Sequence, residues 1–239
     1  MRPRMPWFTL GSIPVLVAAA LLTPGPARAA GEFGVAFLTG FNTYAQSDLN
    51  DELVAPINVL LSGTGYKMDD VSNGIGFGGG LRWRSTTSPI TVAVDYERLN
   101  GNSKLSVPGG EFEVKAPANA FTATVYYFFP SASRARFGFG AGGGLYSSAG
   151  SLRTYDSTTL QEETEDMKGT GVGFHGVGAA DVTLSSVSHL DVSVGYRYAK
   201  TTDVKVAGTK VQNSDGSDSK LDWSGLVTRV GLSFYFGAK

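Results

Sequence analysis

Residues 32–44 read EFGVAFLTGFNTY, and two kinds of residue alternate along this stretch. Its bulky apolar members are separated by two or four positions: Phe33, Val35, Phe37 and Phe41. Small or polar residues stand between them. Because successive side chains of a strand point to opposite faces, the pattern predicts a β-strand with one bulky apolar face and one small, polar face.

Seven later segments repeat this alternation, at 71–84, 90–97, 121–129, 136–146, 171–184, 190–198 and 226–236. The connections between segments are alternately long (45–70, 100–115, 147–169 and 200–220) and short (85–89, 130–135 and 185–188). An even number of strands with long loops at one end and short turns at the other is typical of outer-membrane barrels. The sequence therefore predicts an all-β, eight-stranded, antiparallel, up-and-down β-barrel.

The size of the side chains indicates which face of this barrel points inward. An eight-stranded barrel is only wide enough for side chains to fill its interior, so the bulky apolar face has to point outward. In water such a surface would far exceed the apolar patches of soluble monomers, whereas in hydrocarbon it carries no penalty. We therefore predict a transmembrane, porin-like barrel rather than a soluble one.

The first 29 residues have the order of a secretory signal peptide. Arg2 and Arg4 precede an apolar run at 7–22, and Ala27-Arg28-Ala29 supplies a cleavage site, so we expect a barrel domain over 30–239. Without the three arginines of this segment the net charge is about −4, which disfavours a nucleic-acid partner. The sequence contains no cysteine, so thiol chemistry is excluded.

Aromatic residues cluster where the strands should meet the two membrane interfaces. We expect two aromatic girdles, formed by Phe33, Trp83, Tyr96, Phe121, Phe129, Phe137, Tyr196, Tyr198, Trp223, Phe234 and Phe236.

Ionisable residues at inward positions are expected at two levels. Near mid-height we place Asp95, Glu97, His175, Arg197 and Arg229, and nearer the short turns Arg82, Arg136, Asp181 and Asp191. Because confined charges are costly unless they are paired, both levels are predicted to be mixed-sign networks that plug the lumen. A static polar core is the main interpretation, a gate formed by exchanging pairs is the alternative, and a solute pore is disfavoured by the strand count.

The first long loop carries an apolar stripe at helical spacing, formed by Leu49, Leu53, Ile57 and Leu60. Ser47 or Asp48 is a suitable cap, and Pro56 interrupts the pattern. The sequence predicts a short, broken helix on the barrel rim, or alternatively a lid over a ligand pocket.

Catalytic chemistry has little support in the sequence. The two histidines are His175, at an inward position, and His189, in a short turn, and neither lies in a recognisable nucleophile motif. We predict no catalytic, cofactor or metal site; the acidic run at 162–166 and the segment 215–218 are interpreted as solvated loop tips.

Over residues 31–236 the pattern resembles the OmpA/OmpX/OmpW-like superfamily of small outer-membrane barrels. The last strand is similar to its C-terminal assembly signal, with Arg229, Gly231, Phe234 and Phe236 at the matching positions, although Gly237-Ala238-Lys239 follow where the family usually ends. The resemblance implies recognition by periplasmic chaperones and by the barrel-assembly machinery of a Gram-negative cell envelope.

The leading hypothesis is a monomeric, non-enzymatic integral protein of the outer membrane. It would contact lipid and lipopolysaccharide and use its loops for envelope integrity, surface interaction or adhesion. The alternatives are OmpW-like passage of small hydrophobic compounds, entered beneath the first-loop helix, and a lipid-modifying enzyme that uses His175.

Overall fold

The computed structural model describes residues 31–236. The expected signal peptide (1–29), Ala30 and Gly237-Ala238-Lys239 lie outside the described residues. Within 31–236 no helix is both long and apolar enough to cross a membrane. In this described part of the chain, twelve strands form one antiparallel sheet.

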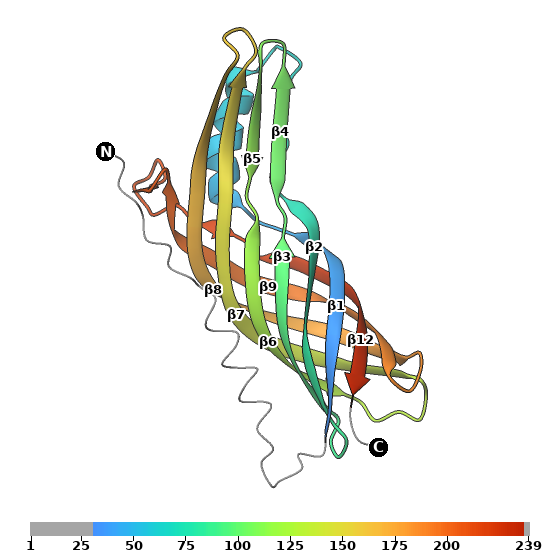
Figure 1. Cartoon of the computed structure of the whole chain (residues 1–239). Coiled ribbons are helices and arrows are strands. Elements are labelled where there is room, and N and C mark those ends of the chain that lie inside the picture. Colours follow the sequence, from blue (N-terminus) through green and yellow to red (C-terminus); the bar gives the residue numbers. More distant parts are fainter. Residues whose placement is uncertain (1–30, 237–239) are drawn as a thin grey trace, which may run out of the picture. The chain divides into compact units, whose positions relative to one another are not determined.

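The sheet closes on itself (Figure 1). The ring of hydrogen-bonded neighbours runs from β1 through β2, β3, β6, β7, β8 and β9 to β12, which pairs with β1 again. These strands are β1 (Gly31–Thr43), β2 (Asn73–Ser85), β3 (Ile90–Leu99), β6 (Ala118–Phe128), β7 (Ala135–Asp156), β8 (Gln161–Thr183), β9 (Ser188–Val206) and β12 (Gly225–Phe236). Closure leaves no free strand edge within the ring, so each backbone group has a neighbour with which to pair.

The strand count of twelve exceeds the expected eight because parts of the long loops are themselves strands. The additional strands are β4 (Asn102–Val107), β5 (Gly110–Lys115), β10 (Thr209–Lys210) and β11 (Leu221–Asp222). The segment 147–169, expected to be a loop, is a long hairpin in which β7 and β8 stay in register as far as the pair Asp156 and Gln161. Polar residues on both faces of this hairpin hide the alternation that identifies a strand.

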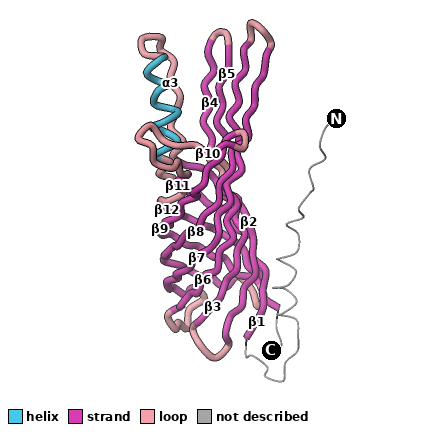
Figure 2. The backbone as a smooth tube through the Cα atoms, turned by 90° about the vertical axis from the view of Figure 1, so that its left-hand side faces the viewer, coloured by secondary structure: helices cyan, strands magenta, loops and turns pink. Residues whose placement is uncertain are grey.

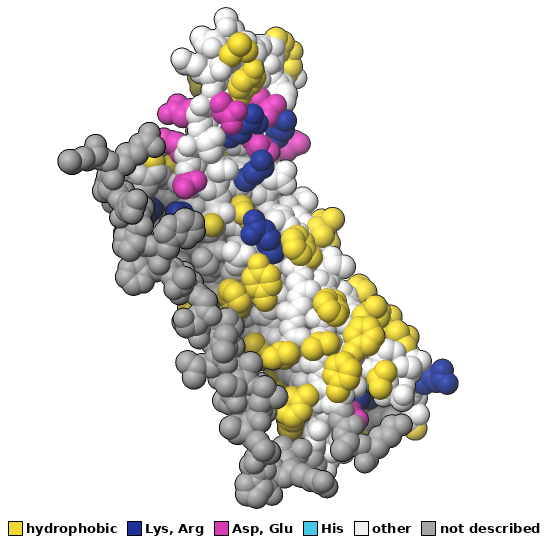
Figure 3. Space-filling model, viewed as in Figure 1, with side chains coloured by type: hydrophobic (Ala, Val, Ile, Leu, Met, Phe, Trp, Pro, Cys, Tyr) yellow, Lys and Arg dark blue, Asp and Glu magenta, His cyan; other side chains and the backbone are white. Residues whose placement is uncertain are grey.

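The residues that alternate in the sequence also alternate in exposure. Along β1, Phe33, Val35, Phe37 and Phe41 are exposed, whereas Ala36, Leu38 and Asn42 are buried inside the ring. Apolar side chains spread over the lower strands, and acidic and basic side chains gather on the raised strands above them (Figure 3). The bulky apolar face therefore points outward, as the sequence predicts.

The first long loop forms a helical segment that stands beside the raised strands (Figure 2). It consists of α2 (Ser47–Leu49), the π-helical turn η1 (Asn50–Val54) and α3 (Ala55–Leu60). Pro56 lies in the first turn of α3, directly after the π-helical turn, so the regular α-helix is interrupted at the proline while the backbone stays helical through it. The π-helical turn before it accommodates the change of register.

Leu49 and Val54 of this segment are buried in an apolar cluster that closes the ring at its loop end, whereas Leu60 is 83% exposed. Leu60 was thus wrongly placed on the packed stripe, while Leu53 and Ile57 pack half-buried against the cluster. The expected cap is also wrong: Gln46 precedes the helix and makes no side-chain capping bond. Asp48 instead accepts hydrogen bonds from Asn213 Nδ2 (3.0 Å) and the Lys220 backbone N–H (2.9 Å), which ties the first loop to the last.

Candidate functional site

The interior of the ring contains two groups of charged side chains, which we call the upper and lower charge layers. The upper layer, nearer the loops, contains Glu97, His175, Arg197 and Arg229; the lower layer, nearer the short turns, contains Glu32, Arg82, Arg84, Asp95, Arg136, Asp181, His189 and Asp191. They are inward-facing because each continues the small and polar phase of its strand.

In the upper layer Glu97 is held at both carboxylate oxygens. Arg229 donates from Nε (3.1 Å) and Nη2 (2.8 Å) to Oε2, and Asn42 Nδ2 lies 3.3 Å from Oε1. Gly76 leaves room for this group, since a Cβ there would lie 2.5 Å from Glu97 Oε1. The small residues between the charges are therefore what allow long side chains to cross the interior.

The other two members of the upper layer bind neutral partners. His175 Nε2 lies 2.8 Å from Thr124 Oγ1, and Arg197 Nε donates to the Trp223 carbonyl at 2.9 Å. Thr124 is the hydroxyl partner that the structure gives to His175, so the Ser and carboxylate that a His-based nucleophile system needs are not its hydrogen-bond partners among residues 31–236.

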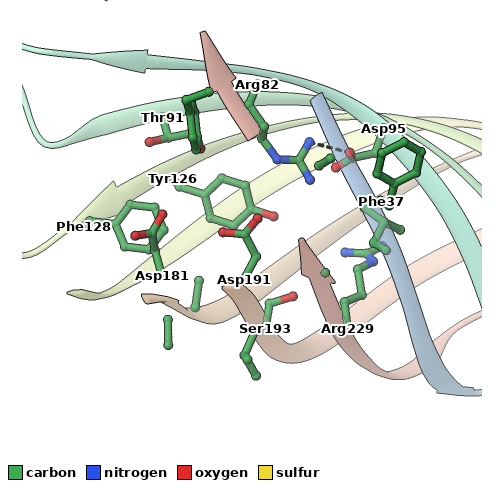
Figure 4. Close-up of a pocket in the computed structure, with 17 residues that line it drawn as sticks. Phe37, Arg82, Thr91, Asp95, Tyr126, Phe128, Asp181, Asp191, Ser193 and Arg229 are labelled. Carbon is green, nitrogen blue, oxygen red and sulfur yellow. Dashed lines mark hydrogen bonds and ion pairs between the residues drawn. The ribbon is translucent and has the colours of Figure 1, made fainter. Parts of the chain in front are cut away.

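In the lower layer, Arg82 Nη1 and Asp95 Oδ1 are 2.5 Å apart, in an ion pair that is visible in Figure 4. Asp95 was expected at mid-height with Glu97. Its ion-pair partner is Arg82 of the lower layer, because the Arg82 side chain extends diagonally from the neighbouring strand to reach it, and we therefore group it with that layer. Asp191 has Ser233 Oγ as its hydrogen-bond partner.

Asp181 connects two basic groups at the end nearest the short turns. His189 Nδ1 lies 3.0 Å from Asp181 Oδ1, and Arg136 Nη2 lies 3.2 Å from Oδ2. The contact between Arg136 and Asp181 is short enough for an ion pair but does not have the alignment of a hydrogen bond. Arg136 Nη2 is therefore left without a hydrogen-bond partner. Arg84 pairs with Glu32 and lies 3.3 Å from His189 Nε2, so this corner holds a continuous polar chain.

Sequence reasoning missed His189 as an interior residue. It was assigned to a short turn, but β9 begins at Ser188, and the His189 side chain is buried. The signal was present, because His189 continues the same alternation as Asp191 and Ser193. Arg84 and Glu32 lie at the ends of the expected strands 71–84 and 32–44, but they were not included in the predicted charge network.

A small cavity of about 40 Å³ lies between the two layers. Arg82, Asp95, Asp191 and Arg229 line it, with Tyr126 and Ser193 (Figure 4). This volume is enough for a few water molecules at most. Above the layers, the apolar cluster contains Trp223, Tyr44, Met68 and Leu99, none of them more than 4% exposed.

The expected aromatic girdles are placed mostly on the outer surface. Those exposed are Phe33, Tyr96, Phe121, Phe129, Phe137, Tyr196, Tyr198 and Phe236, while Trp83 and Phe234 are half-buried. Trp223 is a correction: it is 0% exposed and packs edge-on against Tyr44, with ring centroids 4.9 Å apart. It follows the short strand β11, where the regular alternation had ended, so its direction could not be read from periodicity.

The residues of the expected assembly signal all lie in β12. Arg229 points into the upper charge layer, and Phe236 is exposed on the outer surface. Gly231 faces Leu38 across the pairing with β1 that closes the ring.

Outer membrane proteins are among the solved structures with a similar fold. A major outer membrane protein from Thermus thermophilus has a TM-score of 0.51 and 11% identity, with 85% of this chain and 99% of that chain covered. OprG from Pseudomonas aeruginosa has a TM-score of 0.47 and 14% identity, with 88% of this chain and 98% of that chain covered. Neisserial surface protein A has a TM-score of 0.40 and 14% identity, with 86% of this chain and 97% of that chain covered. At these identities the similarity concerns the fold alone. No curated protein matched the sequence.

The family described as "Outer membrane protein beta-barrel domain" matches residues 15–234, which is most of the chain. This match agrees with the closed antiparallel ring and its apolar outer face. The chain therefore belongs to the outer membrane protein β-barrel family and is a protein of the outer membrane.

Proposed function

We propose that the ring β1–β2–β3–β6–β7–β8–β9–β12 is an eight-stranded transmembrane barrel that anchors a raised, folded loop region and does not conduct solutes. The observation that carries this proposal is the filling of the interior by two charge layers, with a cavity of only about 40 Å³ between them. The protein would act without catalysis, in envelope integrity or surface interaction, and its partners would be outer-membrane lipid and lipopolysaccharide.

The raised region supports an anchoring role because it is folded rather than loose. The hairpin of β4 and β5 extends the sheet through β7, and Arg153 on β7 lies 2.9 Å from Glu162 and 3.1 Å from Glu111. Lys104 holds the pKa of Glu111 below its ordinary value, with a further contribution from Arg153. Such a surface can present a fixed shape to a partner outside the cell.

Two other functions receive less support. Passage of hydrophobic compounds beneath the first-loop helix would require an opening where Val54, Met68 and Trp223 are fully buried. Catalysis at His175 would require a nucleophile where Thr124 is the bonded hydroxyl. Biogenesis through periplasmic chaperones and the barrel-assembly machinery remains an expectation from the β12 sequence.

Planar-bilayer recording tests the proposal. The purified protein should give no large, stable conductance, because ion pairs fill the cross-section of the lumen. A matched variant, Arg229→Gly, removes one of the two arginines of the upper layer and should raise conductance if the layer is what blocks flow. Large, stable currents through the unmodified protein would refute the closed lumen.

A further inference from the structure

The upper charge layer holds one more positive group than it can pair. Arg229 and Glu97 form an ion pair, and Asn42 occupies the second carboxylate oxygen, so Glu97 is fully engaged. Arg197 is 0% exposed, and within residues 31–236 it has no carboxylate within ion-pair distance. Its hydrogen bond is the one from Nε to the Trp223 carbonyl. A buried guanidinium without a counter-charge is strongly disfavoured.

Several donors around Arg197 are also without partners. Both Nη1 and Nη2 of Arg197 are buried and unbonded, as are the hydroxyls of Tyr44 and Tyr146. The ring centroids of both tyrosines are 5.9 Å from Arg197 Cζ, so these side chains surround the guanidinium.

His175 adds a further polar atom to this group. It stands opposite Arg197 in the register of β8 and β9, and its Nδ1 is unbonded. When Thr124 donates to Nε2, Nδ1 carries the proton and becomes another donor.

The charge and the chemistry of these groups select one class of ligand. Guanidinium N–H groups cannot accept hydrogen bonds, whereas a tyrosine hydroxyl can accept one and still has its own proton to donate to an anion. The contacts of Arg197 with the rings of Tyr44 and Tyr146 lie at the outer limit of about 6 Å for a cation–π interaction. They leave the Nη hydrogens of Arg197 without hydrogen-bond acceptors. A water molecule would satisfy individual donors but would bring no negative charge into contact with the guanidinium.

We propose that Arg197, Tyr44, Tyr146 and His175 form a buried binding site for a small monovalent anion of the size of chloride. The site lies at the inner side of the apolar cluster that contains Trp223, to which Tyr44 and Tyr146 belong, and above the lower charge layer, so a larger organic anion has no route to it in the folded protein. The anion would enter while the barrel folds and would then remain enclosed. This inference goes beyond the anchoring role and does not depend on it.

The test uses the protein refolded into detergent micelles in sodium chloride or, at equal ionic strength, in sodium gluconate. A ligand that binds only the folded state multiplies the folding equilibrium constant by 1 + [L]/Kd. With a Kd of about 1 mM, 100 mM chloride should favour folding about 100-fold over gluconate. Crystals grown from protein refolded in sodium bromide should show an anomalous peak beside Arg197.

Variants separate this site from a purely structural arginine. Arg197→Met should lose the chloride effect and should be at least as stable as the unmodified protein in gluconate, because an unpaired charge is gone. Tyr146→Phe, a milder change, should reduce the chloride effect. The matched control, Arg82→Met, disturbs a paired arginine of the lower layer and should destabilise equally in both salts.

Equal stability of the unmodified protein in chloride and gluconate, together with no bromide peak beside Arg197, would overturn the proposal. A water-only site would give that result. The bromide measurement needs no variant, so it remains decisive even if a variant fails to fold.

Discussion

The substitution Phe37→Arg tests most directly whether the apolar outer face of the barrel contacts lipid. Phe37 is 65% exposed and stands six residues from each end of β1. With a rise of about 3.4 Å per residue and a tilt near 45°, it lies about 14 Å from both strand ends along the barrel axis. The apolar band of such barrels is about 25 Å tall, so Phe37 should lie near the middle of the bilayer.

An arginine on the lipid face at this depth costs about 2–4 kcal/mol, which lowers the folding equilibrium constant about 30- to 900-fold. Phe41→Arg is the matched control. Phe41 points the same way on the same strand but should lie about 10 Å nearer the loop-side interface, where the cost falls to about 0–1 kcal/mol.

Reversible urea unfolding in lipid vesicles, followed by tryptophan fluorescence, measures both variants. A water-facing phenylalanine would give a different result, because replacing it with arginine changes stability by no more than about 0.5 kcal/mol. If Phe37→Arg were as stable as Phe41→Arg and both matched the unmodified protein, the assignment of this face to lipid would be refuted.

Three further predictions concern the interior and the loops. Arg229→Met should destabilise the barrel by about 3–5 kcal/mol in chemical denaturation, because the buried Glu97 carboxylate loses its partner. Replacing Glu97 with Met as well should recover much of this loss, and a double variant no more stable than Arg229→Met would contradict the pairing. Leu49→Ala should cost up to about 2–5 kcal/mol and expose the first loop to protease, whereas Leu60→Ala should change stability by less than about 0.5 kcal/mol. Arg153 lowers the pKa of Glu162, so their pairing stabilises the raised hairpin above the ordinary glutamate pKa and is lost as the pH falls through the lowered value. Proteolysis of the hairpin should therefore increase on acidification, and Arg153→Gln should reduce that dependence, leaving the part that comes from the Lys104–Glu111 pair.

The interior charges illustrate how far alternation can be used. It places Glu97, Arg197 and Arg229 inside the ring, because a strand with one apolar outward face fixes the direction of every second side chain. It does not fix which charges meet, since a long arginine can reach a neighbour two residues up or down the next strand. Asp95 therefore pairs with Arg82, whereas strand position alone had grouped it with Glu97.

The loops illustrate the opposite limit. The raised part of β7 and β8 was expected to be loop, because exposure on both faces removes the contrast between apolar and polar positions. Trp223 was expected at the membrane surface, but its neighbours, such as Tyr44, come from the other end of the chain. Neither arrangement leaves a local trace in the sequence.

The sequence by itself determined the strands of the ring, the direction of their side chains and the placement of an apolar face outside and a polar face inside, because these depend on residues two positions apart. Only the tertiary structure decided the ion pairs, the apolar cluster beneath the first-loop helix and the unpaired state of Arg197. These depend on side chains from distant strands that meet inside a closed ring, where the reach of each side chain and the space left by small neighbours select the partner.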